Sequence, residues 1–194
     1  MDLTWLALAV GTLAMLVVAY LAWSIGKEPA GTPQMLEIAS YIEEGARAFI
    51  RRQYTTISIF VALTLIPLII FFKNVGVAIS FAFGATLSML AAYIGMRVAV
   101  KANVRTANAA RTSSAKAFTL AFRGGAVMGL SVVGLSLIGV SLLFWLYQDP
   151  RLIVGFGFGA SLAALFAQLG GGIFTKAADI GADLVGKIEQ RIPE

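Results

Sequence analysis

The feature that most restricts how this chain can fold is a series of five long apolar segments separated by short polar ones. Each is about 20 residues or longer, the length that an α-helix needs to cross a hydrocarbon core of about 30 Å. Within hydrocarbon, a helix satisfies every backbone N–H and C=O group internally. The sequence therefore predicts one all-α membrane domain over residues 1–194. It is a polytopic transmembrane helical bundle with cytosolic helical extensions, and its helices lie at about residues 3–25, 35–72, 77–111, 115–147 and 152–189.

Composition limits the chemistry available to such a bundle. The chain is 59% hydrophobic and 13% charged, whereas soluble proteins are about 45–50% apolar and about 25% charged. The net charge of +5 is spread over the short polar segments, so no basic face is left for binding nucleic acid. With neither cysteine nor histidine in the sequence, any chemistry depends on carboxylates, lysines, arginines and bound cations.

The distribution of positive charge predicts the orientation of the bundle. If the N-terminus faces outside, 13 of the 15 Lys and Arg residues fall in segments on the inner side. The two on the outer side are Lys73 and Arg151. Because inner loops are enriched in Lys and Arg, we expect an integral protein of the cell membrane with its N-terminus outside and residues 176–194 in the cytosol.

Small and capping residues indicate how the helices begin and pack. Thr32 is expected to cap the second helix, since a hydroxyl just before a helix accepts a hydrogen bond from a free N–H group. Two pairs of glycines, Gly125 with Gly129 and Gly155 with Gly159, lie one helical turn apart. Such pairs let helices approach closely in lipid and therefore favour a tightly packed bundle.

A charged pattern follows the fifth apolar segment. Lys176, Asp179, Asp183 and Lys187 are spaced by three, four and four residues, which places their side chains on one face of a helix. Two carboxylates one turn apart suit Mg²⁺, and the flanking lysines suit phosphate oxygens. The same spacing is also typical of a solvated helix face with intrahelical ion pairs. A helix over residues 154–189 would be about 54 Å long, so this end projects into water.

A nucleotide-binding loop is a weaker interpretation of the same segment. Residues 181–187 match G-x-x-x-x-G-K, but Ile188 stands where that motif requires Ser or Thr for Mg²⁺. Asp183 would also bring a carboxylate into the phosphate cradle, and no strand precedes the glycine. The pattern does not support a nucleotide-binding loop.

Residues 170–189, with the sequence GGGIFTKAADIGADLVGKIE, resemble the first substrate motif of the membrane-bound, ion-pumping pyrophosphatases. Four upstream stretches are similar to the same family: residues 42–49 (IEEGARAF), 52–54 (RQY), 102–110 (ANVRTANAA) and 125–129 (GAVMG). The resemblance covers the chain from about residue 42 to its end, and the stretch at residues 170–189 is the most specific part.

This resemblance implies a function and a set of site residues. The chain would be the N-terminal portion of a homodimeric pump that couples hydrolysis of magnesium pyrophosphate to outward transport of H⁺ or Na⁺. Lys176 and Lys187 would contact pyrophosphate, and Asp179, Asp183 and Glu194 would bind Mg²⁺. No catalytic residue is assigned within the chain, and the resemblance leaves open which ion is moved and whether K⁺ is required. The competing hypothesis is a non-catalytic five-helix membrane scaffold or assembly protein.

Three further polar positions each have two interpretations. The family often has an arginine two residues before the three glycines, where it joins an ion gate. Here that position holds Gln168, which is then a candidate gate residue or simply a hydrogen-bonding group between helices. Arg105 and Arg123 are either remote phosphate partners or anchors at the inner membrane surface.

Overall fold

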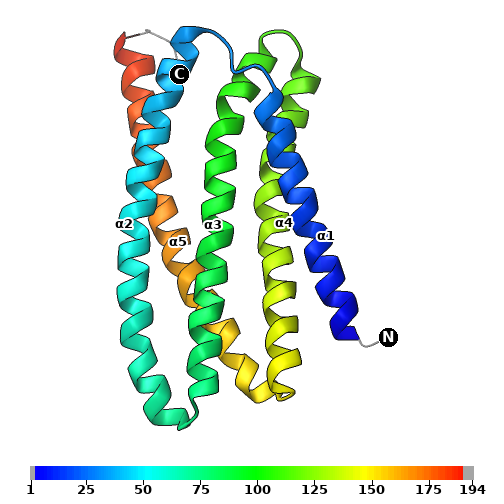
Figure 1. Cartoon of the computed structure of the whole chain (residues 1–194). Coiled ribbons are helices and arrows are strands. Elements are labelled where there is room, and N and C mark those ends of the chain that lie inside the picture. Colours follow the sequence, from blue (N-terminus) through cyan, green and yellow to red (C-terminus); the bar gives the residue numbers. More distant parts are fainter. Residues whose placement is uncertain (1–2, 190–194) are drawn as a thin grey trace.

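Five long helices joined by short connections make up the chain in the computed structural model, which describes residues 3–189 (Figure 1). The α-helices are α1 (Leu3–Lys27), α2 (Pro33–Phe72), α3 (Val75–Ala110), α4 (Ser114–Tyr147) and α5 (Pro150–Leu184). A π-helix, η1 (Val185–Glu189), continues α5. Among the described residues there is no strand, and the predicted all-α class is confirmed.

The helix boundaries follow polar capping residues. The Thr32 hydroxyl accepts a hydrogen bond from the Met35 N–H at 3.3 Å, which confirms the predicted cap. Helices α3, α4 and α5 begin directly after Asn74, Ser113 and Asp149, which cap them in the same way. With η1 counted as the end of the fifth helix, the observed helices begin and end within two residues of the predicted positions. One correction is needed: the last turn of the fifth helix is π rather than α.

Helix α3 lies at the centre of the bundle. It packs most extensively against α4 and α5, while α1 packs on α4 and α2 packs on α3. In Figure 1, α2 lies on one side of α3, and α4 and α1 lie on the other, while α5 crosses behind α3 from the lower end of α4 to the upper part of α2. The C-terminal end of α5 therefore stands beside the upper part of α2, away from α1 and α4.

Glycines bring α3 and α5 into backbone contact. A Cβ atom added at Gly155 or Gly159 of α5 would collide with backbone atoms of α3, which at Gly159 include the Phe81 carbonyl. A Cβ added at Gly84 of α3 would collide in turn with the Phe156 carbonyl of α5. The predicted role of the Gly155 and Gly159 pair is therefore confirmed.

The other predicted glycine pair does not act in this way. Gly125 and Gly129 have no atom of another helix within 4 Å of where a Cβ would lie, so within residues 3–189 they make no close contact. The close approach of α1 and α4 instead uses Gly11 and Gly134, where a Cβ at Gly11 would lie 2.9 Å from the Gly134 carbonyl oxygen. Spacing alone did not show which face of α4 meets a neighbour.

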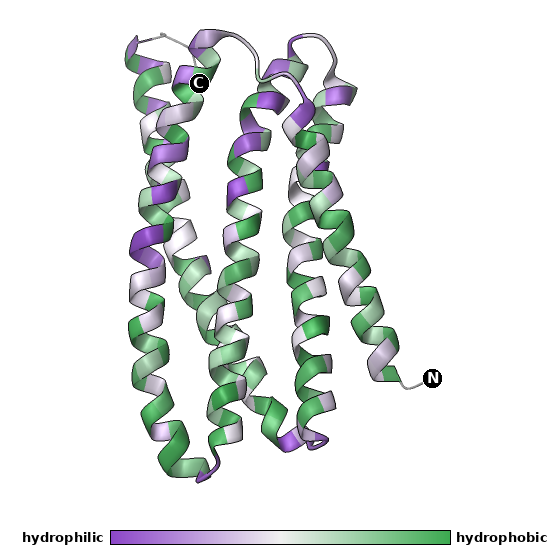
Figure 2. Ribbon diagram, in the orientation of Figure 1, coloured by the Kyte–Doolittle hydropathy of each residue, from purple (hydrophilic) through white to green (hydrophobic). Residues whose placement is uncertain are grey.

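Hydropathy divides the bundle into an apolar body and one polar end. Figure 2 shows apolar residues along most of each helix and polar residues gathered at the upper end. The connections α1–α2 and α3–α4 and the end of α5 all lie there. All five helices are long and apolar enough to cross a membrane, and leucines, isoleucines and phenylalanines are exposed on their outer faces. This arrangement is the one expected of a bundle surrounded by lipid.

Candidate functional site

The predicted charged stripe lies at the polar end of the last helix. Lys176, Asp179 and Asp183 belong to α5, and Lys187 belongs to η1. All four residues are exposed. Within residues 3–189, no hydrogen bond or ion pair involves the side chains of Lys176, Asp179 or Asp183. The alternative of a helix face held by intrahelical ion pairs therefore does not describe these three residues, whose charged groups remain available to a ligand.

The stripe points away from the helices that hold α5. The packed face of α5 contains Gly159, Gly170 and Phe174, which contact α3 or α2. At about 100° of arc per residue, the centre of the charged stripe lies about 140° around the helix from that face. The charged groups therefore face outward from the described bundle, where no described residue encloses them.

The same outward face continues down α5 as an apolar surface. Phe158, Leu165 and Leu169 are 61–65% exposed, although they belong to the part of α5 that crosses the membrane. Gln168 is also exposed there, about 12 Å along the helix axis from Lys176. No hydrogen bond joins its side chain to another helix within residues 3–189, so its role at an ion gate stays a prediction.

Gln53 belongs to the stretch at residues 52–54, for which the sequence predicted no individual role, and it fixes α5 just below the stripe. The side-chain amide of Gln53 on α2 donates a hydrogen bond to the backbone carbonyl of Phe166. A Cβ at Gly170 would lie 2.5 Å from the Gln53 side-chain oxygen, so the first of the three glycines makes room for this amide. One turn further along each helix, the rings of Phe49 and Phe174 lie 5.2 Å apart. These contacts set the position of the stripe relative to α2.

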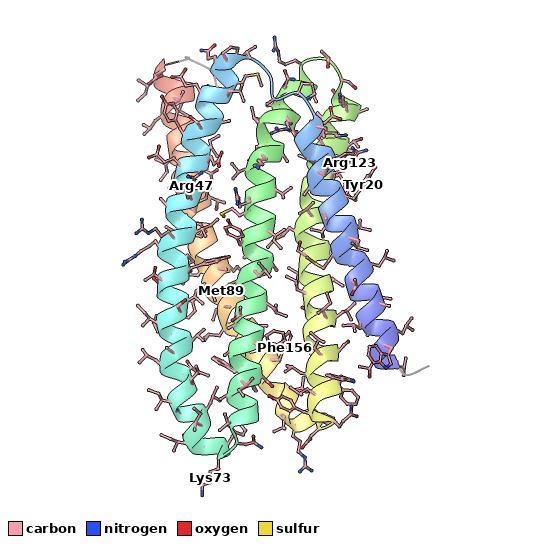
Figure 3. All side chains as sticks on the ribbon, viewed as in Figure 1. Tyr20, Arg47, Lys73, Met89, Arg123 and Phe156 are labelled. Atoms are coloured by element: carbon pink, nitrogen blue, oxygen red, sulfur yellow. The ribbon has the colours of Figure 1, made fainter. Side chains whose placement is uncertain are left out.

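The neighbouring residue holds α2 to α3. The Tyr54 hydroxyl donates a hydrogen bond to the carbonyl of Met89, which lies in the middle part of α3 (Figure 3). Gln53 and Tyr54 thus join α2 to two different helices from adjacent positions. Two polar residues at the start of a long apolar run were the available signal for this role.

Arg105 secures the connection between α1 and α2. Its Nε donates to the Glu28 carbonyl at 3.1 Å, and Asn108 Nδ2 donates to the Pro29 carbonyl at 3.2 Å. Lys116 of α4 completes this arrangement with an ion pair to the Glu28 carboxylate at 2.8 Å. Arg105 is therefore occupied as an anchor of a connecting segment, on the side of α3 away from the stripe.

Arg123 has a comparable structural role. It lies near the upper end of α4 (Figure 3) and donates a hydrogen bond to the Ser24 hydroxyl of α1 at 3.1 Å. Of the two interpretations of Arg105 and Arg123, the structure favours anchoring over contact with a phosphate at the stripe.

The acidic residues of the stripe fit a metal ion that is shared with a phosphate ligand. Asp179 and Asp183 supply two carboxylates, and residues 3–189 contain no group of three or more potential metal-binding side chains. Mg²⁺ is commonly held by one or two carboxylates together with substrate phosphates and water. The pair therefore suits magnesium that arrives with a phosphate ligand. Glu194, the third predicted ligand, lies outside the described residues.

Comparison with known proteins identifies relatives of the whole chain. The family model described as inorganic H⁺ pyrophosphatase matches residues 12–194. A K⁺-insensitive pyrophosphate-energized proton pump of Methanosarcina mazei is 53% identical over 185 residues, which cover 95% of this chain and 28% of the relative. A putative K⁺-stimulated pyrophosphate-energized sodium pump of Clostridium tetani is 52% identical over 187 residues, covering 95% of this chain and 27% of the relative.

A second proton pump gives the same result. The K⁺-insensitive pyrophosphate-energized proton pump 2 of Moorella thermoacetica is 51% identical over 191 residues, with 95% of this chain and 28% of the relative covered. The chain thus spans less than a third of the length of each of these relatives. The matched family model, the level of identity and the five apolar helices agree: the chain is an integral membrane protein that belongs to the inorganic H⁺ pyrophosphatase family.

Proposed function

We propose that this chain forms the N-terminal part of a membrane pyrophosphatase that couples hydrolysis of magnesium pyrophosphate to the pumping of H⁺ or Na⁺. The observation that carries this proposal is the exposed stripe of Lys176, Asp179, Asp183 and Lys187. Three of its charged groups have no partner among residues 3–189. Its relatives are named as pyrophosphate-energized proton or sodium pumps.

In this proposal each residue of the stripe binds or orients the ligand. Lys176 and Lys187 contact pyrophosphate oxygens and offset their negative charge. Asp179 and Asp183, with Glu194 further along the chain, hold magnesium through carboxylate oxygens. Bound magnesium supplies the charge neutralisation that transfer of a phosphoryl group to water requires.

The stripe is one wall of a larger site. It faces away from α2 and α3, and the described residues contain no group of three or more potential metal-binding side chains. A group that activates water must come from elsewhere in the complete protein, because none of the four stripe residues is placed to act as that base. We infer that the complete protein is a homodimer and that the chain alone does not hydrolyse pyrophosphate.

The proposal includes the orientation of the chain in the membrane and its dependence on K⁺. The polar end with the stripe faces the cytosol of a cell membrane, and the N-terminus faces outside, as the distribution of Lys and Arg predicts. The names of the relatives include both K⁺-insensitive and K⁺-stimulated pumps, so K⁺ is a candidate activator. Measuring hydrolysis with and without K⁺ assigns the complete protein to one of these classes.

The decisive experiment replaces one stripe carboxylate in the complete protein. Asp183→Asn keeps the shape of the side chain but removes its charge, so pyrophosphate hydrolysis should fall by roughly 100-fold, the loss typical of removing one stabilising group. The matched control is Glu37→Gln, an exposed carboxylate on α2 whose contact is a 3.2 Å hydrogen bond from Tyr41. This control should hydrolyse at the wild-type rate. Equal rates for both variants would favour the scaffold hypothesis.

A further inference from the structure

A second charged region lies between α2 and α3, away from the stripe. It is a groove of about 400 Å³, lined by Arg47 and Arg51 from α2 and by Arg97 and Lys101 from α3. The remaining polar lining groups are Glu43 and Tyr93. Four cationic side chains thus converge on one groove with a single carboxylate among them, which makes the groove strongly electropositive.

Two of these cations already have partners and two do not. Arg47 pairs with Glu43 at 3.1 Å, and Arg97 donates to the Tyr93 hydroxyl at 2.9 Å. Both contacts join residues of the same helix, four positions apart. Within residues 3–189, no hydrogen bond or ion pair involves the side chains of Arg51 or Lys101. Two positive groups in the groove therefore remain available to an anion.

The groove is separate from the pyrophosphate stripe. Arg47 and Arg51 line the groove, whereas Phe49 and Gln53 contact α5. Residues two positions apart on a helix point about 160° away from each other. The groove therefore opens on the side of α2 opposite the face that holds α5. Its ligand does not depend on the proposed activity, and only the assignment to the inner leaflet rests on the proposed orientation.

The depth of the groove matches the inner surface of a bilayer. The α2–α3 turn at Lys73 lies at the lower end of the bundle, whereas Arg47 lies towards the polar end (Figure 3). About 20 residues of α2 separate Arg52 from Phe72, and about 20 of α3 separate Val75 from Arg97. At 1.5 Å per residue, each stretch is about 30 Å long, the thickness of the hydrocarbon core. Both helices thus place the groove cations at the level of lipid headgroups.

We propose that this groove binds the phosphate group of an anionic phospholipid from the inner leaflet. Arg51 and Lys101 would contact the phosphate oxygens, Arg by its planar pair of donors and Lys as a point charge. Ile50 and Val100 also line the groove, and the exposed apolar faces of α2 and α3 below it suit the acyl chains. A free phosphate anion would make the same contacts as the lipid headgroup. It has no acyl chains, so it gains no binding free energy from the apolar surface below the groove.

The experiment measures lipid retention by the chain in nanodiscs of phosphatidylcholine mixed with phosphatidylglycerol, using native mass spectrometry after release into detergent. The wild type should retain phosphatidylglycerol about tenfold or more in preference to phosphatidylcholine, given the contribution of each cation near a membrane surface. Arg51→Gln with Lys101→Gln should abolish this preference. Arg51→Lys with Lys101→Arg should keep it, because both charges remain.

The control removes the same amount of charge outside the groove. Arg52→Gln with Arg111→Gln replaces two exposed cations of α2 and the α3–α4 connection that do not line the groove. Its preference for phosphatidylglycerol should equal that of the wild type, while circular dichroism checks that every variant is helical. An equal loss in this control would overturn the proposal, because general charge would then explain retention. Retention of both lipids alike by the wild type would overturn it as well.

A final arm separates the two sources of phosphate. Inorganic phosphate is added to the wild type in nanodiscs that contain phosphatidylglycerol. Retention of the lipid should be unchanged at millimolar phosphate. Displacement of phosphatidylglycerol at that concentration would overturn the assignment to a lipid and identify the groove as a site for a free anion.

Discussion

The side-chain amide of Gln53 donates a hydrogen bond to the carbonyl of Phe166, and the absence of a side chain at Gly170 leaves room for that amide. This contact joins two segments that are more than a hundred residues apart in sequence. It fixes α5 directly below the charged stripe. Gln53 therefore needs a glycine at position 170, because any larger residue there would displace its amide.

We expect Gly170→Ala to weaken the docking of α5 through Gln53. The added methyl group would collide with the amide, and overpacking of this kind costs about 1–3 kcal/mol. Gly170→Ala should therefore cost more free energy of unfolding in the wild type than in a Gln53→Ala background, as a double-mutant cycle in detergent would show. The control is Gly171→Ala, where no other helix lies within 4 Å. If Gly170→Ala lowers the free energy of unfolding equally in the two backgrounds, Gln53 and Gly170 are not in contact.

Contact between α3 and α5 should depend on Gly159 in the same manner. Gly159→Ala places a methyl group against the Phe81 carbonyl, so it should lower the free energy of unfolding by about 1–3 kcal/mol. Gly157→Ala is the matched control, since its Cβ would meet open space. The midpoint of unfolding in mixed detergent would measure both. If the two variants are equally stable, the backbone contact does not hold the helices together.

Orientation can be tested with single cysteines, because the chain contains none. Cysteines at Asn74 and Ser114 lie at opposite ends of the bundle, one capping α3 and one beginning α4. A membrane-impermeant maleimide applied to sealed vesicles should label the cysteine at position 74 from outside. It should label the cysteine at position 114 only after the vesicles are opened. Labelling of both positions from the same side would contradict the five-span arrangement.

The chain expressed alone should insert into a membrane but release no phosphate from pyrophosphate. Insertion depends on hydrophobic segments and flanking charge, which this chain has, whereas catalysis needs a group that activates water. Phosphate release by the purified chain with magnesium would be compared with that of a Lys176→Ala, Asp183→Ala double variant. Phosphate release by the unmodified chain that the double variant lacks would show that these five helices suffice for hydrolysis, and would contradict the prediction.

Gln168→Arg should disturb ion transport more than hydrolysis in the complete protein. The substitution adds a charge to the membrane-spanning part of α5, about 12 Å below Lys176, and a charge at that depth affects an ion pathway strongly. The ratio of ion flux to pyrophosphate turnover in vesicles measures this effect. An unchanged ratio would mean that Gln168 does not lie at the gate.

Much of the fold could be predicted because its signals are local. Hydropathy located all five helices, and residues such as Thr32 marked where helices begin, since both effects depend on near neighbours in sequence. The stripe was predicted from helical spacing, which α5 preserves through Asp183. The π-helical turn at Lys187 was not predicted.

The pairing of distant residues could not be predicted in this way. No local pattern shows that Gln53 bonds α5 or that Arg105 bonds the α1–α2 connection. That Gly125 and Gly129 meet no other helix within the described residues has the same origin, because spacing defines a helix face but not which helix meets it. Only the packed arrangement decides such contacts.

The glycine contact between α3 and α5 has a mechanical consequence. Gly155 and Gly159 lie against backbone atoms of α3 at successive turns. Sliding α5 by one turn towards its N-terminal end would bring Ala163 to the level of Gly159, and its methyl group would strike the Phe81 region. Displacement of α5 in this direction is therefore blocked unless α3 moves with it. A movement of α5 that draws the charged stripe towards the bilayer must therefore move the two helices together.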